Sequence, residues 1–382
     1  MKKHIYLLVF IACMQFIEAQ VIYEPFNSAK LGETREIKIQ LPRGYDANPD
    51  KKYPIIMVFD GDYMFEAVAG NVDYYAYWDD MPDAIVVGVN QIDSREADMY
   101  YSEQNSLPIE TGAAFFEFVG MELIPHLEKT YRTENFRVAV GHGETANFIN
   151  YYLLKSDPLF KAYIVISPDL APEMTSYIPE RLTKFQTKIF YYLATSNNDV
   201  ASLKAGSEAL NTAISGIDNK NVLYNFKTLE EPSHYALPAY VIPDALQKIF
   251  LVYQPISKQE YKDTILKLES SPVLYLEEKY QTILDLFGID KQILVNDFKA
   301  IEAAIEKTEQ FQYYEDLGKI ARKQYPETML GSYYLARFYE ETGEPKKAMK
   351  TYQSAYVLEE IAGVTKDLVL EKAEEIKADF GY

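Results

Sequence analysis

The chain has 382 residues, of which 48% are hydrophobic and 14% aromatic, and this composition is typical of a folded globular protein. Its 57 acidic residues outnumber the 38 basic ones and give a formal net charge of −19. Nucleic acids and anionic membrane surfaces attract clusters of Lys and Arg, so this charge argues against both as partners. The length is enough for a core domain of roughly 200 residues or more and a second folded unit.

The N-terminus has the pattern of a secretory signal. Lys2 and Lys3 form a basic region, residues 5–12 form a short apolar run, and a cleavage site is predicted after Ala19. This run is too short to span a bilayer, and no other stretch approaches about 18 consecutive apolar residues. We therefore expect residues 1–19 to be a signal peptide, and the protein to be exported to the periplasm or secreted by a bacterium.

The only cysteine of the sequence, Cys13, lies inside this predicted signal. A lipid attached to Cys13 would make the protein a lipoprotein, which is the less favoured alternative. If the segment is removed, the mature chain has no thiol, and therefore no disulfide and no cysteine ligand for a metal.

From residue 20 to 253, short apolar runs alternate with helical patterns. Strand patterns occur at 35–42, 55–59, 84–89, 138–140, 163–166, 188–193 and 222–226. Residues 111–131 carry apolar side chains at helical spacing. This alternation predicts an α/β fold with a doubly wound, mostly parallel sheet, whose ligands bind at the carboxyl ends of the strands.

The stretch 136–150 is the most informative in the sequence. An apolar strand pattern turns sharply at Gly141-His142-Gly143 and continues as a helical pattern. Strand, tight turn and helix are the context of the G-x-S-x-G nucleophile elbow of α/β-hydrolases. Here Gly143 stands at the position of the nucleophilic serine, and Thr145 replaces the last glycine. Gly143 has no side chain that could attack a substrate.

Taken together, residues 23–253 resemble the putative esterase family of α/β-hydrolases, the esterase D or enterochelin-esterase-like group. The resemblance rests on short motifs in a fixed order, at 32–37, 41–45, 53–55, 60–62, 122–125, 131–133, 141–142, 166–168 and 234. It implies an α/β-hydrolase domain over residues 20–253 and ester hydrolysis by a serine, a late histidine and an acid. Several bacterial members of this family carry a tetratricopeptide-like tail.

The resemblance also implies roles for individual residues. His234 would be the histidine base, and Asp199 the acid that orients it. Backbone N–H groups near Gly61, Asp62 and Glu144 would hold the oxyanion. Because the nucleophile is missing, these roles are expected to be vestigial.

Three further residues are expected to line the cleft of this domain. His142 lies in the turn itself, and Tyr77 and Trp78 belong to an aromatic segment at 73–78. A cleft of this composition would suit a small ester or an aromatic ligand.

Two functions compete on this sequence. The preferred one is a hydrolase scaffold that has lost its activity and binds a ligand or a protein. The alternative is an active carboxylic-ester hydrolase in which Glu144 acts as a nucleophile, or as a water-activating base paired with His234. A contact between Glu144 and His234 would favour the alternative, and a solvent-directed Glu144 would weaken it. A metal held by His142, Glu144 and His234 has no recognised spacing, so neither a metal nor a cofactor is expected.

From about residue 254 the Gly and Pro punctuation thins, and long helical patterns follow. We expect a linker at 254–272 and an all-α domain at 273–382. Residues 331–360 match the offsets of a tetratricopeptide unit, a degenerate unit precedes it at 302–326, and a last helix covers 366–380. A generic helical bundle is the alternative. Tetratricopeptide repeats present concave surfaces to peptides, so the tail is expected to dock a protein partner.

Overall fold

The computed structural model describes residues 21–382, so the predicted signal peptide and Cys13 lie outside the described residues. The chain divides into two compact units. The first contains the described residues up to Leu251 together with Leu286–Gly288, and the second contains Val252–Asp285 and Ile289–Tyr382. Within residues 21–382, no helix is both long and apolar enough to cross a membrane.

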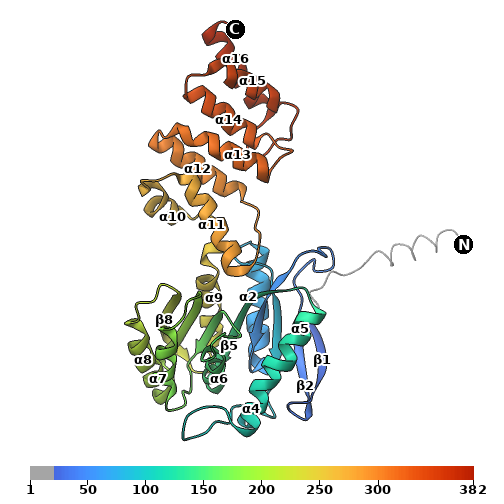
Figure 1. Ribbon diagram of the computed structural model, residues 1–382, viewed down its shortest axis with the longest axis vertical. Helices are drawn as coiled ribbons and strands as arrows, with labels where there is room; N and C mark the ends of the chain where they lie inside the picture. The colour runs from blue at the N-terminus through green and yellow to red at the C-terminus, as the bar shows by residue number, and fades with distance from the viewer. Residues whose placement is uncertain (1–20) are drawn as a thin grey trace, which may run out of the picture. The chain divides into compact units, whose positions relative to one another are not determined.

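The first unit is built on one eight-stranded sheet with the strand order β1-β2-β4-β3-β5-β6-β7-β8 (Figure 1). The strands are β1 (Val21–Ser28), β2 (Glu33–Gln40), β3 (Tyr53–Val58), β4 (Ile85–Val89), β5 (Thr133–His142), β6 (Ala162–Ile166), β7 (Ile189–Asn198) and β8 (Val222–Ser233). β2 runs antiparallel to both β1 and β4, and the pairs from β4 to β8 are parallel. The predicted mostly parallel sheet is therefore confirmed.

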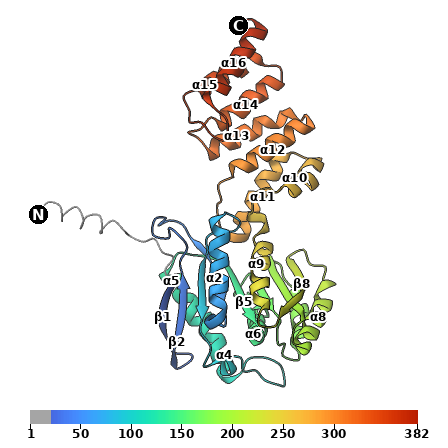
Figure 2. The same cartoon turned by 180° about the vertical axis from the view of Figure 1, so that it is seen from behind.

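Helices cover both faces of this sheet, which explains why its central strands read as continuous apolar runs. One face packs against α4 (Glu110–Glu117), α5 (Ile124–Thr130), α6 (Glu144–Leu153), α7 (Met174–Leu182) and α8 (Ala201–Ser215). The other face carries α2 (Gly61–Tyr77) and α9 (Leu237–Ile249), which lie nearest the viewer in Figure 2. All six residues of β3 are buried, and Ile55 and Met57 belong to the core on the α6 side.

The edge strand β1 had no recognisable strand pattern in the sequence. Its residues are mostly half-buried or exposed, and Pro25 lies in the middle of it. An edge strand needs to bury little apolar surface, and proline is tolerated there. The sheet-forming signal was therefore weak at this strand.

The helix predicted for residues 111–131 forms with one irregularity. α4 and α5 are joined by a π-helical segment, Phe118–Leu123, without a break in the helical path. Pro125 lies two residues after this segment and has no N–H to donate to the preceding turn. π-turns of this kind occur frequently at functional sites.

The second unit is helical and contains α10 (Lys258–Asp263), α11 (Pro272–Phe287), α12 (Val295–Thr308), α13 (Tyr314–Gln324), α14 (Leu330–Glu341), α15 (Pro345–Ala355) and α16 (Lys366–Phe380). α16 has the bounds of the predicted last helix. From α13 to α16 each helix packs on the next in sequence (Figure 1).

Glycines set the close approach of α13 and α14. A Cβ on Gly331 would lie 2.6 Å from the backbone nitrogen of Arg322 and 2.8 Å from the carbonyl oxygen of Gly318. No side chain fits at that distance, so only glycine allows the two helices to cross here.

The linker expected at 254–272 is wrong. This segment contains α10 and a 3-10 turn at Ile265–Lys267, and it belongs to the helical unit. Ser257 and Glu260 form a capping box at the start of α10, and Ile265 is buried. The S-x-x-E signature in the sequence could have predicted this helix start.

Candidate functional site

The elbow between β5 and α6 is a sharp turn centred on Gly143. Its φ and ψ angles are 62° and −120°, a conformation that favours glycine. The Gly143 N–H donates to the carbonyl of Ile166 at 3.0 Å, so the turn is fixed against β6. A Cβ on Gly141 would lie 2.6 Å from the carbonyl oxygen of Thr145, so the chain can fold back onto α6 only with glycine there. The turn therefore has the form of a nucleophile elbow but no nucleophile.

His234 and Asp199 are brought together beyond the carboxyl ends of β8 and β7. The His234 Nδ1 lies 2.9 Å from the Asp199 Oδ1, and the Asp199 side chain is fully buried. Asp199 also accepts hydrogen bonds from the Thr195 hydroxyl at 2.9 Å and the Val200 N–H at 2.8 Å. Burial raises the pKa of Asp199, but hydrogen bonds from Ser167, Thr195 and His234 outweigh it and leave the pKa below its ordinary value. Asp199 is therefore a carboxylate that orients the His234 ring.

The other edge of the His234 ring faces the elbow. A Cβ built on Gly143 would lie 3.9 Å from the His234 Nε2 and 3.5 Å from the Arg95 Nη2. A serine hydroxyl at this position would be within hydrogen-bond reach of Nε2. The three positions therefore have the arrangement of a Ser-His-Asp triad from which the serine is missing.

Arg95 and Asp60 form an ion pair beside the elbow. Arg95 is the first residue of the short helix α3 (Arg95–Asp98), and its Nε lies 2.8 Å from the Asp60 Oδ1. Its Nη2 donates to the Asp60 Oδ2 and to the His142 carbonyl, both at 3.2 Å. Asp60, two residues after the end of β3, is only 1% exposed and has a φ of 53°. The guanidinium is therefore held in a fixed position against the turn.

Glu144 pairs with this same guanidinium through the Arg95 Nη1. Its side chain is 44% exposed, and in the described part of the chain no hydrogen bond or ion pair joins it to His234. The contact that would have favoured Glu144 as a nucleophile or base does not form. Glu144 thus belongs to an ion-pair network in which two carboxylates compensate one guanidinium.

Two hydroxyl groups complete this network around Asp60. The Thr145 Oγ1 donates to the Asp60 Oδ2 at 2.8 Å, and the Tyr63 hydroxyl lies 3.1 Å from the same oxygen. Thr145 is fully buried and also accepts the His142 N–H at 2.9 Å. Thr145 therefore stabilises the turn through these buried hydrogen bonds and does not replace the serine.

His142 lies between the two groups. Its ring stacks on that of His234 with centroids 4.3 Å apart, and its Nδ1 is 3.0 Å from the Tyr63 hydroxyl. Burial, together with the neighbouring His234 and Arg95, lowers the pKa of His142 to about 4. His142 is therefore neutral near pH 7.

Gly61 and Asp62 start α2, as Glu144 starts α6. The N–H groups of the first residues of a helix have no acceptor within it, so both helix starts offer the donors that the family resemblance implies for an oxyanion. A Cβ on Gly61 would lie 2.8 Å from the Val89 nitrogen, so glycine is needed for α2 to approach β4. The Asp62 carboxylate accepts the N–H groups of Gln91 at 2.6 Å and Ile92 at 3.0 Å, which holds the loop after β4.

The expectation that Tyr77 and Trp78 line the cleft is wrong. The aromatic segment lies at the C-terminal end of α2, whose N-terminal residue Gly61 is at the elbow edge of the sheet. A helix of 17 residues that rises about 1.5 Å per residue carries this segment to the opposite edge. Tyr77 and Trp78 are 63% and 60% exposed there.

Four residues shape the site in ways that were not predicted from the sequence, namely Asp60, Tyr63, Arg95 and Ser167. The Ser167 hydroxyl is fully buried, 3.1 Å from the His234 Nδ1, on the edge of the ring that Asp199 also contacts. A nucleophile would have to lie at Nε2, so Ser167 orients the ring and does not attack. Asp60 and Ser167 each lie within two residues of the end of a buried strand, and this was the signal available in the sequence.

Among residues 21–382, no group of three or more His, Cys, Asp or Glu side chains is placed to hold a metal ion. In particular, Glu144 is bound to Arg95 and the rings of His142 and His234 are stacked on each other.

A mostly parallel sheet with an elbow at the carboxyl end of its central strand β5 defines an α/β-hydrolase fold. Residues 28–213 match the model of the family described as "Putative esterase", so the first unit belongs to this family.

Solved structures agree with this fold. A crystal structure of an uncharacterised protein from Capnocytophaga ochracea is 31% identical, with a TM-score of 0.86, and the match covers 94% of this chain and 100% of that one. An IroE-like serine hydrolase from Shewanella oneidensis is 19% identical with a TM-score of 0.59, over 79% of this chain and 98% of that one. The BES protein from Bacillus cereus is 21% identical with a TM-score of 0.53, over 61% and 96% respectively. The latter two similarities support the fold alone. A search of curated proteins finds no match.

Proposed function

We propose that this member of the esterase family is a hydrolase scaffold without acyl-enzyme chemistry, whose cleft binds a small ester or aromatic ligand. The observation that carries the proposal is the elbow. Gly143 stands where the nucleophile belongs, while His234 and Asp199 are placed as a base and its orienting acid. Acyl transfer needs an atom that attacks the carbonyl, and glycine supplies none.

The ion-pair network beside the elbow supports the same conclusion. An oxyanion is stabilised by uncompensated donors and positive charge. The positive charge of Arg95 is already compensated by Asp60 and Glu144, and the carboxylate of Glu144 lies on the first residue of α6. The network therefore disfavours a developing negative charge at the place where the family reaction would create one.

A second function is favoured by the retained pair of His234 and Asp199. His234 could act as a general base that activates a water molecule directly, with Nε2 facing the open position beside Gly143. The Glu144 variant of this chemistry has less support, because Glu144 is bound to Arg95. Enzymes that lose a triad member retain about 10³–10⁴-fold acceleration over water, so any such activity would be low.

Hydrolysis of p-nitrophenyl acetate and butyrate by the mature chain distinguishes the two functions. We compare the wild type with Gly143→Ser, Gly143→Ala, His234→Ala and the double variant Gly143→Ser/His234→Ala. The proposal expects the wild type and His234→Ala to be equally slow, and Gly143→Ser to gain at least about 100-fold, because a hydroxyl is restored beside Nε2.

Gly143→Ala is the matched control for this gain. It introduces the same side-chain strain in the elbow, about 1–3 kcal/mol, but no hydroxyl. Thermal unfolding of both variants shows whether they remain folded, and the double variant should lose whatever Gly143→Ser gains. Turnover by the wild type that His234→Ala abolishes would overturn the proposal in favour of the water mechanism.

Two further parts of the proposal concern the ends of the chain. We propose that the protein is exported, on the basis of its N-terminal pattern, and N-terminal sequencing of the natively expressed protein should then begin at Gln20. We also propose that the helical unit is a tetratricopeptide-like protein-docking module. The support is the packing of each helix from α13 to α16 on the next, which is the arrangement of a repeat array.

A further inference from the structure

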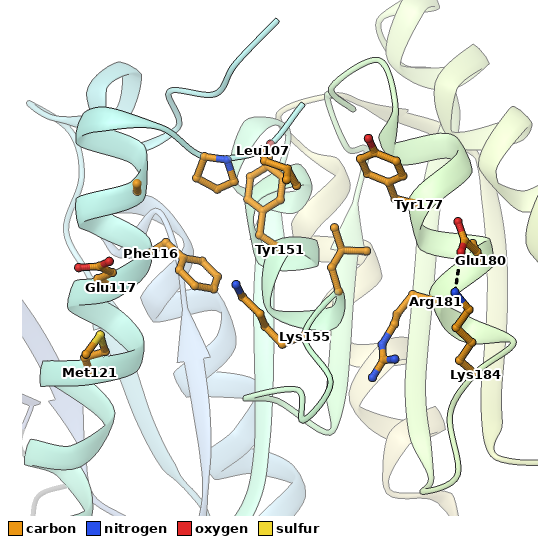
Figure 3. Close-up of a pocket in the computed structure, with 13 residues that line it drawn as sticks. Leu107, Phe116, Glu117, Met121, Tyr151, Lys155, Tyr177, Glu180, Arg181 and Lys184 are labelled. Carbon is orange, nitrogen blue, oxygen red and sulfur yellow. Dashed lines mark hydrogen bonds and ion pairs between the residues drawn. The ribbon is translucent and has the colours of Figure 1, made fainter. Parts of the chain in front are cut away.

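A hollow lies on the α6 side of the hydrolase unit, between α4 and α7 and beside the C-terminal half of α6 (Figure 3). Its volume is about 810 Å³, within the range of about 300–1,000 Å³ typical of small-molecule pockets. Its lining, drawn from the described chain, does not include Gly143, His234 or Arg95. Tyr151 in this hollow is seven residues along α6 from Glu144, or about 10 Å along the helix axis. We call this hollow the α6 groove.

The walls of the α6 groove carry aromatic rings from three helices. Phe116 comes from α4, Tyr151 from α6 and Tyr177 from α7, and Figure 3 shows the three rings around the same opening. Tyr151 is fixed by a hydrogen bond from the Asn147 amide at 3.0 Å, and Phe116 stacks on Tyr152 with ring centroids 4.3 Å apart. Rings that are held in place in this way favour a flat apolar ligand, which can stack against them without ordering the wall first.

In the α6 groove the acidic side chains have ion-pair partners, whereas two of the basic side chains do not. Its two carboxylates are each matched by a lysine, because Glu117 pairs with Lys30 at 2.6 Å and Glu180 with Lys184 at 2.5 Å. Lys155 and Arg181, by contrast, have no carboxylate at ion-pair distance among the described residues.

Of these two cations, only Lys155 faces the aromatic wall of the groove. The Lys155 ammonium lies 4.9 Å from the centroid of the Phe116 ring, at the aromatic wall. The Arg181 guanidinium, by contrast, donates to the carbonyls of Ser156 at 2.9 Å and Leu153 at 3.3 Å and lies 4.5 Å from the centroid of the Phe185 ring. Figure 3 shows it directed away from Lys155 and the aromatic rings. In a chain with a net charge of −19, a lysine that has no acidic partner and lies beside these rings points to an anionic ligand.

The π-helical segment forms part of the wall of the groove. Met121 lies on this segment, lines the groove and is 61% exposed. A smaller hollow of about 250 Å³ shares Phe116, Met121 and Lys155 with the groove, so the accessible space continues around the Lys155 side chain. An exposed methionine at such a wall adapts to the shape of a ligand.

We propose that the α6 groove is a binding site for a small aromatic carboxylate, separate from the elbow. The ring of the ligand packs among Phe116, Tyr151 and Tyr177, and its carboxylate binds Lys155. Charge complementarity and aromatic lining select this class over neutral aromatic compounds and over linear fatty acids. The site does not depend on whether the elbow has any activity.

Isothermal titration calorimetry on the full mature chain tests the site with three probes. 2-Naphthoate should bind saturably at millimolar concentration or below. 2-Naphthylmethanol, which keeps the ring but lacks the charge, and decanoate, which keeps the charge but lacks the ring, should each bind at least about three-fold more weakly. Equal or tighter binding of either of these, or no saturable binding of 2-naphthoate, would overturn the proposal.

Variants locate the site. Lys155→Met keeps the apolar stem over Phe116 but removes the charge, and it should weaken 2-naphthoate binding about two- to five-fold, as expected for an exposed charge pair. Lys220→Met, at an exposed lysine outside the groove, should leave binding unchanged.

Met121→Glu should weaken binding more than Met121→Gln, because only Met121→Glu adds a negative charge at the wall, which repels the carboxylate of the ligand. His234→Ala should have no effect. If His234→Ala weakens binding and Lys155→Met does not, the ligand lies in the elbow cleft and the proposed groove site is wrong.

Discussion

The two sides of the elbow differ in what they retain of hydrolase chemistry. On the side of β6, β7 and β8, Ser167, Asp199 and His234 form the arrangement of a base with its orienting groups. On the side of β3 and β5, an ion-pair network of Arg95 with Asp60 and Glu144 adjoins the position where a nucleophile would stand. We call the first the base side and the second the network side.

The difference shows that the base side does not depend on a nucleophile for its structure. Asp199 is held by Thr195 and the Val200 N–H, and His234 is held by Asp199 and Ser167. None of these bonds involves residue 143. The base side can therefore keep its structure in a chain without the serine. On the network side, the charges of Arg95, Asp60 and Glu144 compensate one another beside the position where the serine would stand.

The largest effect is expected from breaking the network side at its centre. Asp60→Asn keeps the shape of the side chain but removes the charge that pairs with Arg95. It also replaces one acceptor oxygen by an NH₂ group, although the neighbouring Arg95, Thr145 and Tyr63 are all hydrogen-bond donors to this side chain. Loss of one partner from a buried pair costs about 3–5 kcal/mol, and because Arg95 is one-third exposed we expect about 3 kcal/mol in the free energy of unfolding. Urea denaturation measures this loss.

The corresponding change on the base side is His234→Ala. It should cost less than half as much as Asp60→Asn, because the polar groups that it leaves behind, Asp199 and Ser167, hydrogen-bond to one another and Asp199 keeps Thr195 as well. Equal destabilisation by the two variants would show that the base side and the network side are not independent of each other.

An intermediate effect is expected from pH, through His142. Its pKa is lowered from 6.5 to about 4 on folding, so folding favours its neutral form. This stabilisation is fully present above about pH 6.5 and is lost as the pH falls towards 4. A lowering of about 2.5 units corresponds to roughly 3 kcal/mol at most.

Carboxylates such as Asp199 also lose stabilisation in acid, so the measurement compares two proteins. The free energy of unfolding of wild type and His142→Asn is determined between pH 8 and pH 4, where asparagine can accept the Tyr63 hydroxyl but cannot titrate. The two curves should converge as the pH falls below about 6.5. Parallel curves over the whole range would show that His142 does not carry this dependence.

The smallest effect is expected at the exposed end of the network. Glu144→Gln removes a charge whose side chain is 44% exposed, so the pair with Arg95 contributes less than about 1 kcal/mol to stability. Calorimetric melting should show a shift of at most a few degrees. The variant also removes one of the two carboxylates that compensate Arg95. In a Gly143→Ser background, Glu144→Gln should therefore raise the esterase rate, because the guanidinium can then stabilise the oxyanion better. A lower rate would show that Glu144 assists the reaction.

The sequence predicted the elements with strong local patterns. The runs at 55–59, 84–89 and 163–166 are strands because buried parallel strands must be apolar on both faces. The last helix, 366–380, has a capping Thr365 before it and Gly381 after it, so both ends were marked. The weakly patterned elements were missed, namely the edge strand β1 and the short helix α10, because neither buries enough apolar surface to produce a periodic signal.

For the site, the sequence identified residues by their position after strands but not their partners. The motifs placed His142, Gly143 and His234 at one edge of the sheet, and the structure brings Asp199 to the same edge within 2.9 Å of His234. Tyr77 and Trp78 were misplaced because the length of α2 was not apparent from its composition. Nothing in the sequence around Arg95 indicated that it would bind Asp60 and Glu144.

The sequence by itself therefore determined the fold class, the central elbow and the absence of a serine, since each depends on residues that are adjacent in the chain. The tertiary structure alone decided which charges meet. The pairing of Arg95 with Asp60 and Glu144 and the gathering of Phe116, Lys155 and Arg181 in the α6 groove join segments separated by tens of residues. Such contacts depend on how the helices pack against the sheet, and a local pattern of side chains carries no record of that packing.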